Sequence, residues 1–267
     1  MKKFLSIKEF SKMSGIESST LRYWDEIGIF SPIKRNENNN YRYYSPEQII
    51  TVNFFTVLSN LNVPLKTMGA MEGDRYPEGI IELIDTQEKF LDDQMRKLRE
   101  AYSVIHTRRE LIKQGLKADE SKISVVNLPE KRMVLGPEAN FKDGEPFYEP
   151  FSEFGDKAPD LRINLNYPIG GLLNSYENFL KSPGEPDHFF SFDPTGNHII
   201  PAGEYLVAYH RGYYGDFGDL TERVDKYVRE NNLTLGGPVY CLYLLDEICE
   251  KDPSNYLVCV TIPVLRQ

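Results

Sequence analysis

The sequence predicts an α+β protein built from three consecutive parts: a winged helix-turn-helix, a long coiled-coil helix and a C-terminal α+β domain. Three observations predict this order. Two short helical patterns near the start are separated by a glycine, and a later helical pattern continues with almost no helix breaker. Strand-like segments dominate the remainder. We therefore divide the chain into residues 1–76, 77–117 and 118–267.

The first part opens with two short helices. Residues 6–13 carry apolar side chains at helical spacing, and Ser6 and Glu9 form a capping-box pattern at their start. Gly15 interrupts the pattern, and residues 18–27 then resume it with apolar side chains three apart. Two short helices joined by a tight turn that contains glycine form a helix-turn-helix.

A hairpin is expected directly after these helices. The segment SPIKRNENNNYRYY contains a proline and four asparagines and ends in residues that favour strands. We interpret it as a wing with its tip near residues 36–39. Arginines and aromatic residues are interleaved in both the second helix and the wing, which is typical of a surface that binds an anion.

Residues 77–117 predict one long helix with a coiled-coil seam. Apolar residues recur there every seven positions, and others occupy the companion positions, with Glu88 and Arg109 as polar interruptions. The seam comprises Ile84, Leu91, Leu98, Ile105 and Ile112, with Met95, Tyr102 and Leu116 beside them. Such a helix spans about 60 Å, and no neighbouring segment is long enough to cover it. We therefore expect a homodimer; the alternative is a helix packed on its own domain.

The last part, after the polar linker GLKADESK, has the composition of a mostly antiparallel sheet with one clear helix. The helix is expected around residues 216–232. Five segments have the composition of strands: RMVLG, LRINLNY, EYLVAYH, VYCLYLL and NYLVCVTIPV.

The charge differs between the parts. The chain has 31 Lys and Arg against 40 Asp and Glu, a formal net charge of -9. Residues 1–76 carry +2 and residues 77–117 carry 0, so residues 118–267 carry -11. A slightly basic first part can face an anion while the acidic last part faces a different ligand.

The composition excludes several classes of protein. No apolar run reaches the ~18 residues of a membrane helix, and the N-terminus lacks a signal-peptide core, so we expect a cytoplasmic protein with no membrane partner. Cys241, Cys249 and Cys259 form neither a disulfide framework nor a CxxC pair, so we expect no metal and no other cofactor. The histidines lack a nucleophile motif such as G-x-S-x-G, so we do not expect an enzyme.

The first two parts resemble the MerR family of transcription regulators over about residues 4–117. The resemblance rests on the motifs TLRYWDEIGIFSP and NYRYYS and on the order of the helices, the wing and the long helix. Most relatives have tyrosine where this chain has Trp24. The last part resembles the GyrI-like effector-binding domain, through PAGEY at residues 201–205, GPVYCLY at residues 237–243 and IPV at residues 262–264. The combination is similar to the multidrug-responsive, BmrR-like branch of the family.

The resemblance implies a dimeric regulator that binds double-stranded promoter DNA at an over-long spacer between the two promoter elements. A small amphipathic effector makes such a dimer bend and untwist the DNA, so that RNA polymerase can engage both elements. Bending DNA costs on the order of 1–6 kcal/mol. The effector must supply this shift by binding the two states with different affinity.

The second helix is expected to enter the major groove of the DNA. Arg22 is expected to contact a base or a phosphate, with a salt bridge to Asp25 or Glu26 as the alternative. Tyr23 is expected to donate its hydroxyl to a phosphate. Trp24 continues the apolar spacing of the helix, so the protein core is its alternative.

The wing and a following helix supply the other expected DNA contacts. Arg42 is expected to bind a phosphate, while Tyr41 and Tyr43 lie on the opposite face of the strand and have wing packing as their alternative. Lys66 stands at an expected helix start, where backbone N–H groups also favour phosphate, with a solvated surface lysine as its alternative. The full set is Ser19, Thr20, Arg22, Tyr23, Trp24, Tyr41, Arg42, Tyr43 and Lys66.

The expected effector site is a pocket lined by aromatic residues in the last part. Aromatic faces attract organic cations by roughly 0.5–2 kcal/mol each. The net charge of -11 also draws cations towards this domain. For any single aromatic residue, the core of the sheet is the alternative. The set is Phe141, Tyr148, Phe151, Tyr167, Tyr209, Cys241, Tyr243 and Tyr256.

Cys241 departs from the family pattern. By register it stands where cation-binding relatives have a buried glutamate, while Tyr243 keeps an aromatic residue on the same face of the strand. Without that carboxylate, a preference for neutral or zwitterionic ligands is one expectation. The other is that a different acid reaches the pocket, the candidates being Glu145, Glu149 and Glu204.

Two other functions stay open. One is a DNA-binding repressor or architectural protein whose last part senses a protein partner or oxidation of the Cys241 thiol, with a buried apolar cysteine as the alternative for that residue. The other is hydrolase activity, because GyrI-like domains need not serve transcription alone.

Overall fold

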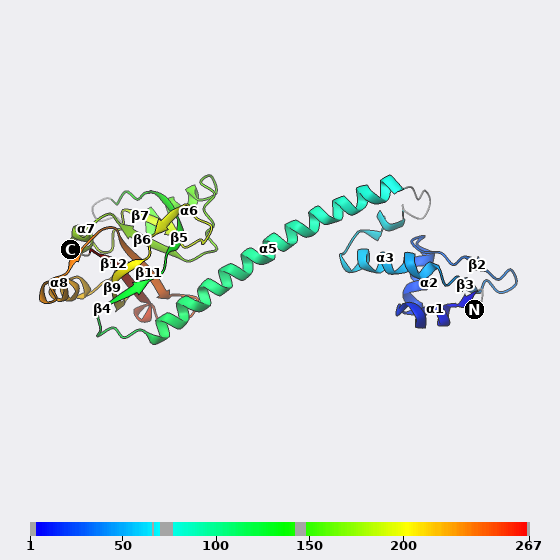
Figure 1. The fold of residues 1–267 in the computed structure, drawn as a ribbon, viewed down its shortest axis with the longest axis horizontal. Helices are drawn as coiled ribbons and strands as arrows, with labels where there is room; N and C mark the ends of the chain where they lie inside the picture. Colours follow the sequence, from blue (N-terminus) through cyan, green and yellow to red (C-terminus); the bar gives the residue numbers. More distant parts are fainter. Residues whose placement is uncertain (1–3, 66, 70–76, 142–147, 266–267) are drawn as a thin grey trace. The chain divides into compact units, whose positions relative to one another are not determined.

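The computed structural model describes residues 4–65, 67–69, 77–141 and 148–265. The chain folds into two compact units, one up to Met95 and one from Arg96 onwards (Figure 1). Helix α5 (Pro77–Lys117) contributes its first half to unit 1 and its second half to unit 2. The bounds of α5 are those of the long helix that the heptad pattern predicts.

Unit 1 contains a helix-turn-helix and a small antiparallel sheet. Its elements before α5 are β1 (Leu5–Ser6), α1 (Ile7–Ser14), α2 (Ser18–Glu26), β2 (Lys34–Arg35), β3 (Arg42–Tyr44) and α3 (Gln48–Asn60). The predicted capping box is present, because the Ser6 hydroxyl accepts from the Glu9 N–H and the Glu9 carboxylate accepts from the Ser6 N–H. Gly15 ends α1 at a φ of 75°, which glycine adopts without strain. Strands β2 and β3 form the predicted wing.

The core of unit 1 is aromatic. The rings of Phe10 and Tyr44 stack with their centroids 4.6 Å apart, and the Phe30 ring lies 5.8 Å from that of Tyr44. From α2, Leu21 and Trp24 are buried in the same core, with Trp24 only 4% exposed. Burial of these two side chains turns the remaining face of α2 towards solvent.

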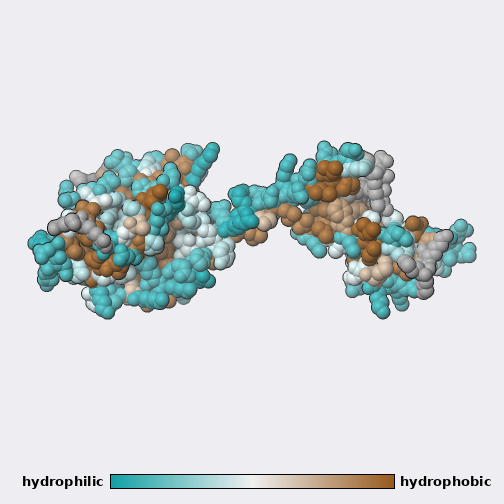
Figure 2. All heavy atoms as spheres, in the orientation of Figure 1, coloured by the Kyte–Doolittle hydropathy of each residue, from teal (hydrophilic) through white to brown (hydrophobic). Residues whose placement is uncertain are grey.

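Helix α5 exposes apolar side chains along most of its length. Leu98, Tyr102 and Ile105 are 69%, 70% and 68% exposed, and Ile84 also reaches the surface. Figure 2 shows brown, apolar atoms at the surface along the first half of α5. Ile112, by contrast, packs against the core of unit 2. Most of the predicted seam is therefore uncovered in a single chain.

Unit 2 is a curled antiparallel sheet with helices packed on its faces (Figure 1). Its strands are β4 (Ser124–Leu128), β5 (Lys131–Glu138), β6 (Ile169–Leu173), β7 (His188–Ser191), β8 (His198–Ile200), β9 (Gly203–Arg211), β10 (Thr234–Leu235), β11 (Val239–Leu245) and β12 (Leu257–Leu265). Its helices are α6 (Tyr148–Lys157), α7 (Tyr176–Lys181), α8 (Leu220–Glu230) and the short η1 (Pro253–Asn255), besides the end of α5. The strand order is β4-β9-β12-β11-β6-β7-β5-β8, and β10 pairs with β12.

The two faces of this sheet carry different cores. On one face, Phe179 of α7 and Val224 of α8 are buried against the central strands. On the opposite face, Leu111 near the end of α5 is buried with Tyr240 of β11. A smaller cluster joins α6 to Phe189 of β7. Because side chains alternate along a strand, neighbouring residues of β9, β11 and β12 face different cores.

One predicted strand is wrong. Residues 161–167 form turns, and the strand β6 begins only after Pro168. The apolar alternation there comes from a loop: Ile163 and Tyr167 are buried, whereas Leu165 between them is 40% exposed. Arg162 adopts a left-handed φ of 56°, which breaks an extended strand. Three of the other predicted strands lie within β5, β9 and β11, and the fourth, residues 255–264, overlaps β12 but begins two residues before it; the predicted helix contains α8.

Candidate nucleic-acid interface and ligand cavity

The outward face of α2 presents polar residues at the surface. Arg22, Tyr23 and Ser19 are exposed, Tyr23 to 49%, and Thr20 is half-buried. In the ranges that the structure describes, Arg22 makes no ion pair, because both acids proposed as its alternative partners face the wing arginines instead. The guanidinium of Arg22 is therefore available to a ligand.

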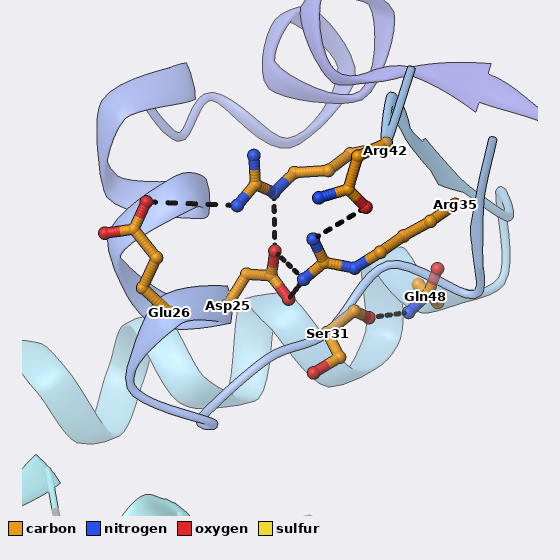
Figure 3. Close-up of polar contacts among 7 residues, drawn as sticks. Asp25, Glu26, Ser31, Arg35, Arg42 and Gln48 are labelled. Carbon is orange, nitrogen blue, oxygen red and sulfur yellow. Dashed lines mark hydrogen bonds and ion pairs between the residues drawn. The ribbon is translucent and has the colours of Figure 1, made fainter. Parts of the chain in front are cut away.

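A buried ion-pair cluster joins α2 to the wing (Figure 3). The Asp25 side chain is 1% exposed and accepts from Arg35 Nη2 at 2.6 and 2.7 Å and from Arg42 Nε at 2.5 Å. Arg42 also lies 3.9 Å from Glu26. Burial and the charge of Asp25 raise the pKa of the adjacent Tyr44 hydroxyl to about 12. Arg42, expected to bind a phosphate, thus has an internal carboxylate partner that positions the wing on α2.

The other predicted DNA residues divide between surface and core. Tyr41 is 40% exposed, and its ring lies 5.5 Å from that of the half-buried Tyr43, so these two rings pack together on the wing. The prediction that Trp24 contacts DNA is wrong, because this side chain lies in the core of unit 1 and is not available to DNA. Lys66 lies outside the described residues.

A cavity of about 390 Å³ opens on unit 2, on the face of the sheet that α7 and α8 cover. Its walls come from α6, the 165–173 segment, β7, the loop after β9, and β11. Gly171 of β6 lines it, and a Cβ at that position would lie 2.8 Å from Pro186 Cβ. The volume falls within the roughly 300–1,000 Å³ of small-molecule sites.

Four tyrosines cluster at this cavity. The Tyr214 ring lies edge-on to Tyr243 with the centroids 4.6 Å apart, and Tyr213 and Tyr256 surround it at 5.4 and 5.5 Å. The Tyr243 hydroxyl donates to the Tyr213 carbonyl at 3.0 Å and accepts from the Gly215 N–H at 3.2 Å, which fixes the loop. Burial raises the pKa of the Tyr214 and Tyr243 hydroxyls, so both remain protonated donors near neutral pH.

Two carboxylates and one arginine line the same cavity. Asp246 binds Arg108 of α5, with Oδ2 2.5 Å from Nη1, so these two charges offset each other. Glu247 accepts a hydrogen bond from the Tyr214 hydroxyl. It makes no ion pair within the described ranges, and its residue is exposed at the cavity. The cavity therefore combines aromatic walls with one negative charge that no arginine or lysine of the described ranges neutralises.

Five of the predicted effector residues line this cavity: Tyr148, Phe151, Tyr167, Cys241 and Tyr243. Two others pack behind the wall, because the Phe141 ring lies 6.5 Å from that of Phe189 and Tyr256 supports Tyr213 and Tyr214.

Tyr209 is not brought to this cavity. The register pairs Cys241 with Val260 and Val260 with Ala208, so Ala208 faces the side of Cys241 and Tyr209 faces the opposite side. The acid beside the tyrosines is also not one of the three proposed. Glu149 and Glu204 do not line the cavity, and Glu145 lies outside the described residues.

The expected effector set leaves out Tyr213, Tyr214 and Glu247, of which the first two line the cavity and cluster with Tyr243 and the third contributes a carboxylate. The signal for the two tyrosines is the YYGDFG loop between a strand and a helix, where side chains are free of sheet packing. The signal for the carboxylates is the DE pair that directly follows the strand VYCLYLL.

Other kinds of site find no support in the described part of the chain. No group of three or more His, Cys, Asp or Glu side chains there could hold a metal ion. None of the helices in those ranges combines the length and apolar character that crossing a membrane requires.

Two regions of the chain match known families. Residues 5–71 match the MerR HTH family regulatory protein, which covers the helix-turn-helix and the wing. Residues 193–265 match the GyrI-like small molecule binding domain, which covers β8 to β12 and the tyrosine cluster.

The chain is also similar over nearly its whole length to two regulators of Bacillus subtilis. It is 27% identical over 260 residues to the multidrug-efflux transporter 2 regulator, covering 96% of this chain and 94% of that protein. It is 23% identical over 275 residues to the multidrug-efflux transporter 1 regulator, covering 96% of each. The transcriptional regulator BrlR of Pseudomonas aeruginosa is 33% identical over 99 residues, 37% of this chain and 35% of that protein. The chain therefore combines a MerR-type HTH domain in its first part with a GyrI-like small molecule binding domain in its last part.

Proposed function

We propose that the chain is a cytoplasmic, homodimeric regulator that binds promoter DNA through unit 1 and an aromatic organic cation in the cavity of unit 2. The observation that carries the proposal is the Tyr213, Tyr214, Tyr243 and Tyr256 cluster beside the carboxylate of Glu247. Similarity to two multidrug-efflux transporter regulators supports a drug-like effector.

The charge of the cavity favours a cationic effector over a neutral, zwitterionic or anionic one. Each tyrosine face contributes roughly 0.5–2 kcal/mol to binding a desolvated cation. Asp246 is already paired with Arg108, so a cation would meet Glu247 without first displacing a protein cation. An anion would have to lie beside that carboxylate, which is unfavourable at close range. Glu247 therefore takes the role of the glutamate that Cys241 replaces.

On the DNA side, Arg22 and Tyr23 are the contacts that we propose from α2, with the wing beside them. The wing is held by the Asp25 cluster, so its tip can be presented to the DNA backbone at a fixed angle. Phosphate contacts of this kind position a protein on DNA without specifying its sequence. The apolar seam of α5 supports the homodimer, because water-exposed Leu98 and Ile105 need a partner surface.

Effector binding would act through α5. The helix contributes Arg108 to the cavity and also belongs to unit 1. A ligand that binds one conformation of the dimer more tightly shifts the population towards it. Untwisting and bending promoter DNA costs on the order of 1–6 kcal/mol, which a differential affinity of about fivefold to twenty-thousandfold supplies. RNA polymerase is then a partner through the promoter, and no catalytic step is required.

The test is a thermal-shift and calorimetric titration of the full chain with matched ligands. The probes are (biphenylmethyl)trimethylammonium and its uncharged isostere, in which carbon replaces nitrogen. We expect the cation to bind more tightly, and Glu247→Gln to weaken it about tenfold, as for loss of one charged partner. Glu250→Gln, three residues away and outside the cavity lining, is the matched control.

Equal binding of cation and isostere, or equal affinity in the two glutamate variants, would overturn the cation assignment. A run-off transcription assay with purified RNA polymerase then tests regulation. We expect the cation to change the yield from a promoter that the protein binds, and an unchanged yield would leave only ligand binding.

A further inference from the structure

A second cavity of about 230 Å³ lies on the opposite face of the same sheet. It is covered by the last turns of α5 and lined mainly by apolar side chains, among them Leu111, Phe190, Leu242 and Leu244. Alternation along β11 separates the two sites, because Cys241 and Tyr243 line the first cavity, whereas Tyr240, Leu242 and Leu244 line the second.

This second cavity holds one uncompensated positive charge. Lys131 of β5 lines it, and none of the described aspartates and glutamates does. Across the described ranges, the Lys131 ammonium makes no ion pair, and it lies over the Phe192 ring, 5.1 Å from the ring centroid. Burial lowers the pKa of this ammonium, as expected where a charge loses water without gaining a carboxylate. Residue Lys131 is half-buried, so part of its side chain still contacts solvent.

Further polar groups gather near Lys131, where the side chains of Gln114, Tyr209 and Cys259 hydrogen-bond to one another. The Gln114 amide of α5 donates to Cys259 Sγ at 3.8 Å, and that sulfur lies 3.7 Å from Thr261 Oγ1. Tyr209 of β9 lines the same space. Sulfur is a weak hydrogen-bond acceptor, so an oxygen acceptor placed among these donors would form better bonds.

We propose that the second cavity binds a small monocarboxylate with an apolar body, its carboxylate paired with the Lys131 ammonium and its body against the leucine and phenylalanine side chains. The carboxylate supplies the missing counter-charge, and a charge-assisted N–H···O bond is about twice as strong as a neutral one. The cavity is smaller than the roughly 300–1,000 Å³ of drug-sized sites, which restricts the body to a single ring or a short chain.

This site has the opposite charge preference to the first cavity and goes beyond the proposed cation effector. The first cavity carries two carboxylates and one arginine, whereas the second carries one lysine alone. A carboxylate ligand is therefore directed to the second cavity by charge, and failure of either assignment leaves the other standing.

The test is calorimetric titration of the full chain with hydrocinnamate and with its neutral amide, hydrocinnamamide. We expect the carboxylate to bind at least about tenfold more tightly than the amide, the effect of one charged hydrogen bond. Lys131→Met should abolish this preference, and Lys131→Arg should keep it. Arg132→Met is the matched control, because Arg132 is 47% exposed on the neighbouring strand position and pairs with Glu130 at 3.7 Å.

Three outcomes would overturn the proposal: equal binding of acid and amide, unchanged binding in Lys131→Met, or loss of hydrocinnamate binding when the biphenyl cation saturates the wild-type protein. The last outcome, if the apparent affinity for the acid keeps falling as the cation concentration rises, would mean that the acid occupies the first cavity, because coupling between two separate sites changes an affinity only by a fixed factor. Because the competition uses wild-type protein, it decides between the cavities even if Lys131→Met does not fold.

Discussion

Arg42→Met and Arg22→Met should separate an internal ion pair from a DNA contact. Arg42 Nε lies 2.5 Å from a carboxylate that is 1% exposed, so methionine removes one charge-assisted bond there. Such a bond contributes about 1.5–3 kcal/mol to the free energy of unfolding. Asp25 keeps Arg35 at 2.6 Å, so the ~3–5 kcal/mol cost of an orphaned buried charge is not expected. Arg22 makes no ion pair in the described ranges. Arg22→Met should therefore change the free energy of unfolding by less than about 0.5 kcal/mol.

Urea unfolding followed by tryptophan fluorescence measures this difference. The chain has one tryptophan, Trp24, which is buried in the core of unit 1, so the signal reports that unit. The second measurement is the salt dependence of binding to a duplex that the protein selects from a random pool. A plot of log K against log salt concentration has a negative slope, and each lost phosphate contact reduces its magnitude by about 0.9. We expect Arg22→Met to reduce the magnitude of this slope and Arg42→Met to leave the slope nearly unchanged.

The opposite pattern would refute this reasoning. If Arg42→Met leaves the free energy of unfolding unchanged and lowers the salt slope, Arg42 binds a phosphate and its contact with Asp25 is incidental. Arg35→Met is the matched control, because it removes the other guanidinium from the same carboxylate.

Two further predictions concern the dimer and the thiols. Leu98→Glu, on the exposed seam of α5, should convert a dimer to a monomer in sedimentation equilibrium, whereas Arg99→Glu on the same helix should not; a monomeric wild type would contradict the seam assignment. Burial raises the pKa of the Cys259 thiol to about 11 and that of Cys241 further, while Cys249 is exposed. At pH 8 the two buried cysteines therefore stay protonated, and iodoacetamide should modify one thiol per native chain and three after denaturation, as counted by mass spectrometry. Rapid modification of Cys241 would instead favour the thiol-sensing alternative.

The parts of the fold that local physics determines could be predicted from the sequence. The Ser6–Glu9 capping box, the left-handed Gly15 and the bounds of α5 depend on residues a few positions apart, and all three are present. Strand β6 was missed because Gly170 and Gly171 have low strand propensity. These glycines are required by distant residues: a Cβ on Gly170 would lie 2.3 Å from Phe190 Cζ. Such constraints exist only after the sheet has formed.

The ligand cavity was predictable only along single strands. Cys241 and Tyr243 share a face because they are two residues apart on β11, and both line the first cavity. Placing Tyr209 required the register between β9 and β12, where it pairs with Cys259, and one sequence does not contain that information. Glu247 escaped prediction because it lies beyond the end of its strand, where the direction of a side chain follows the turn.

The last turns of α5 form part of both cavities. Arg108 lines the first, while Leu111 and Gln114 line the second, and a Cβ on Gly115 would lie 2.8 Å from Leu245 Cγ. Because α5 packs so closely on Leu245, it can hardly move to accommodate a ligand in one cavity without changing the wall of the other cavity. A cation in the first cavity and a carboxylate in the second would then both act on α5. The position of this helix would depend on which of the two ligands is bound. Thermodynamic reciprocity makes this measurable, because each ligand must change the other's affinity by the same factor.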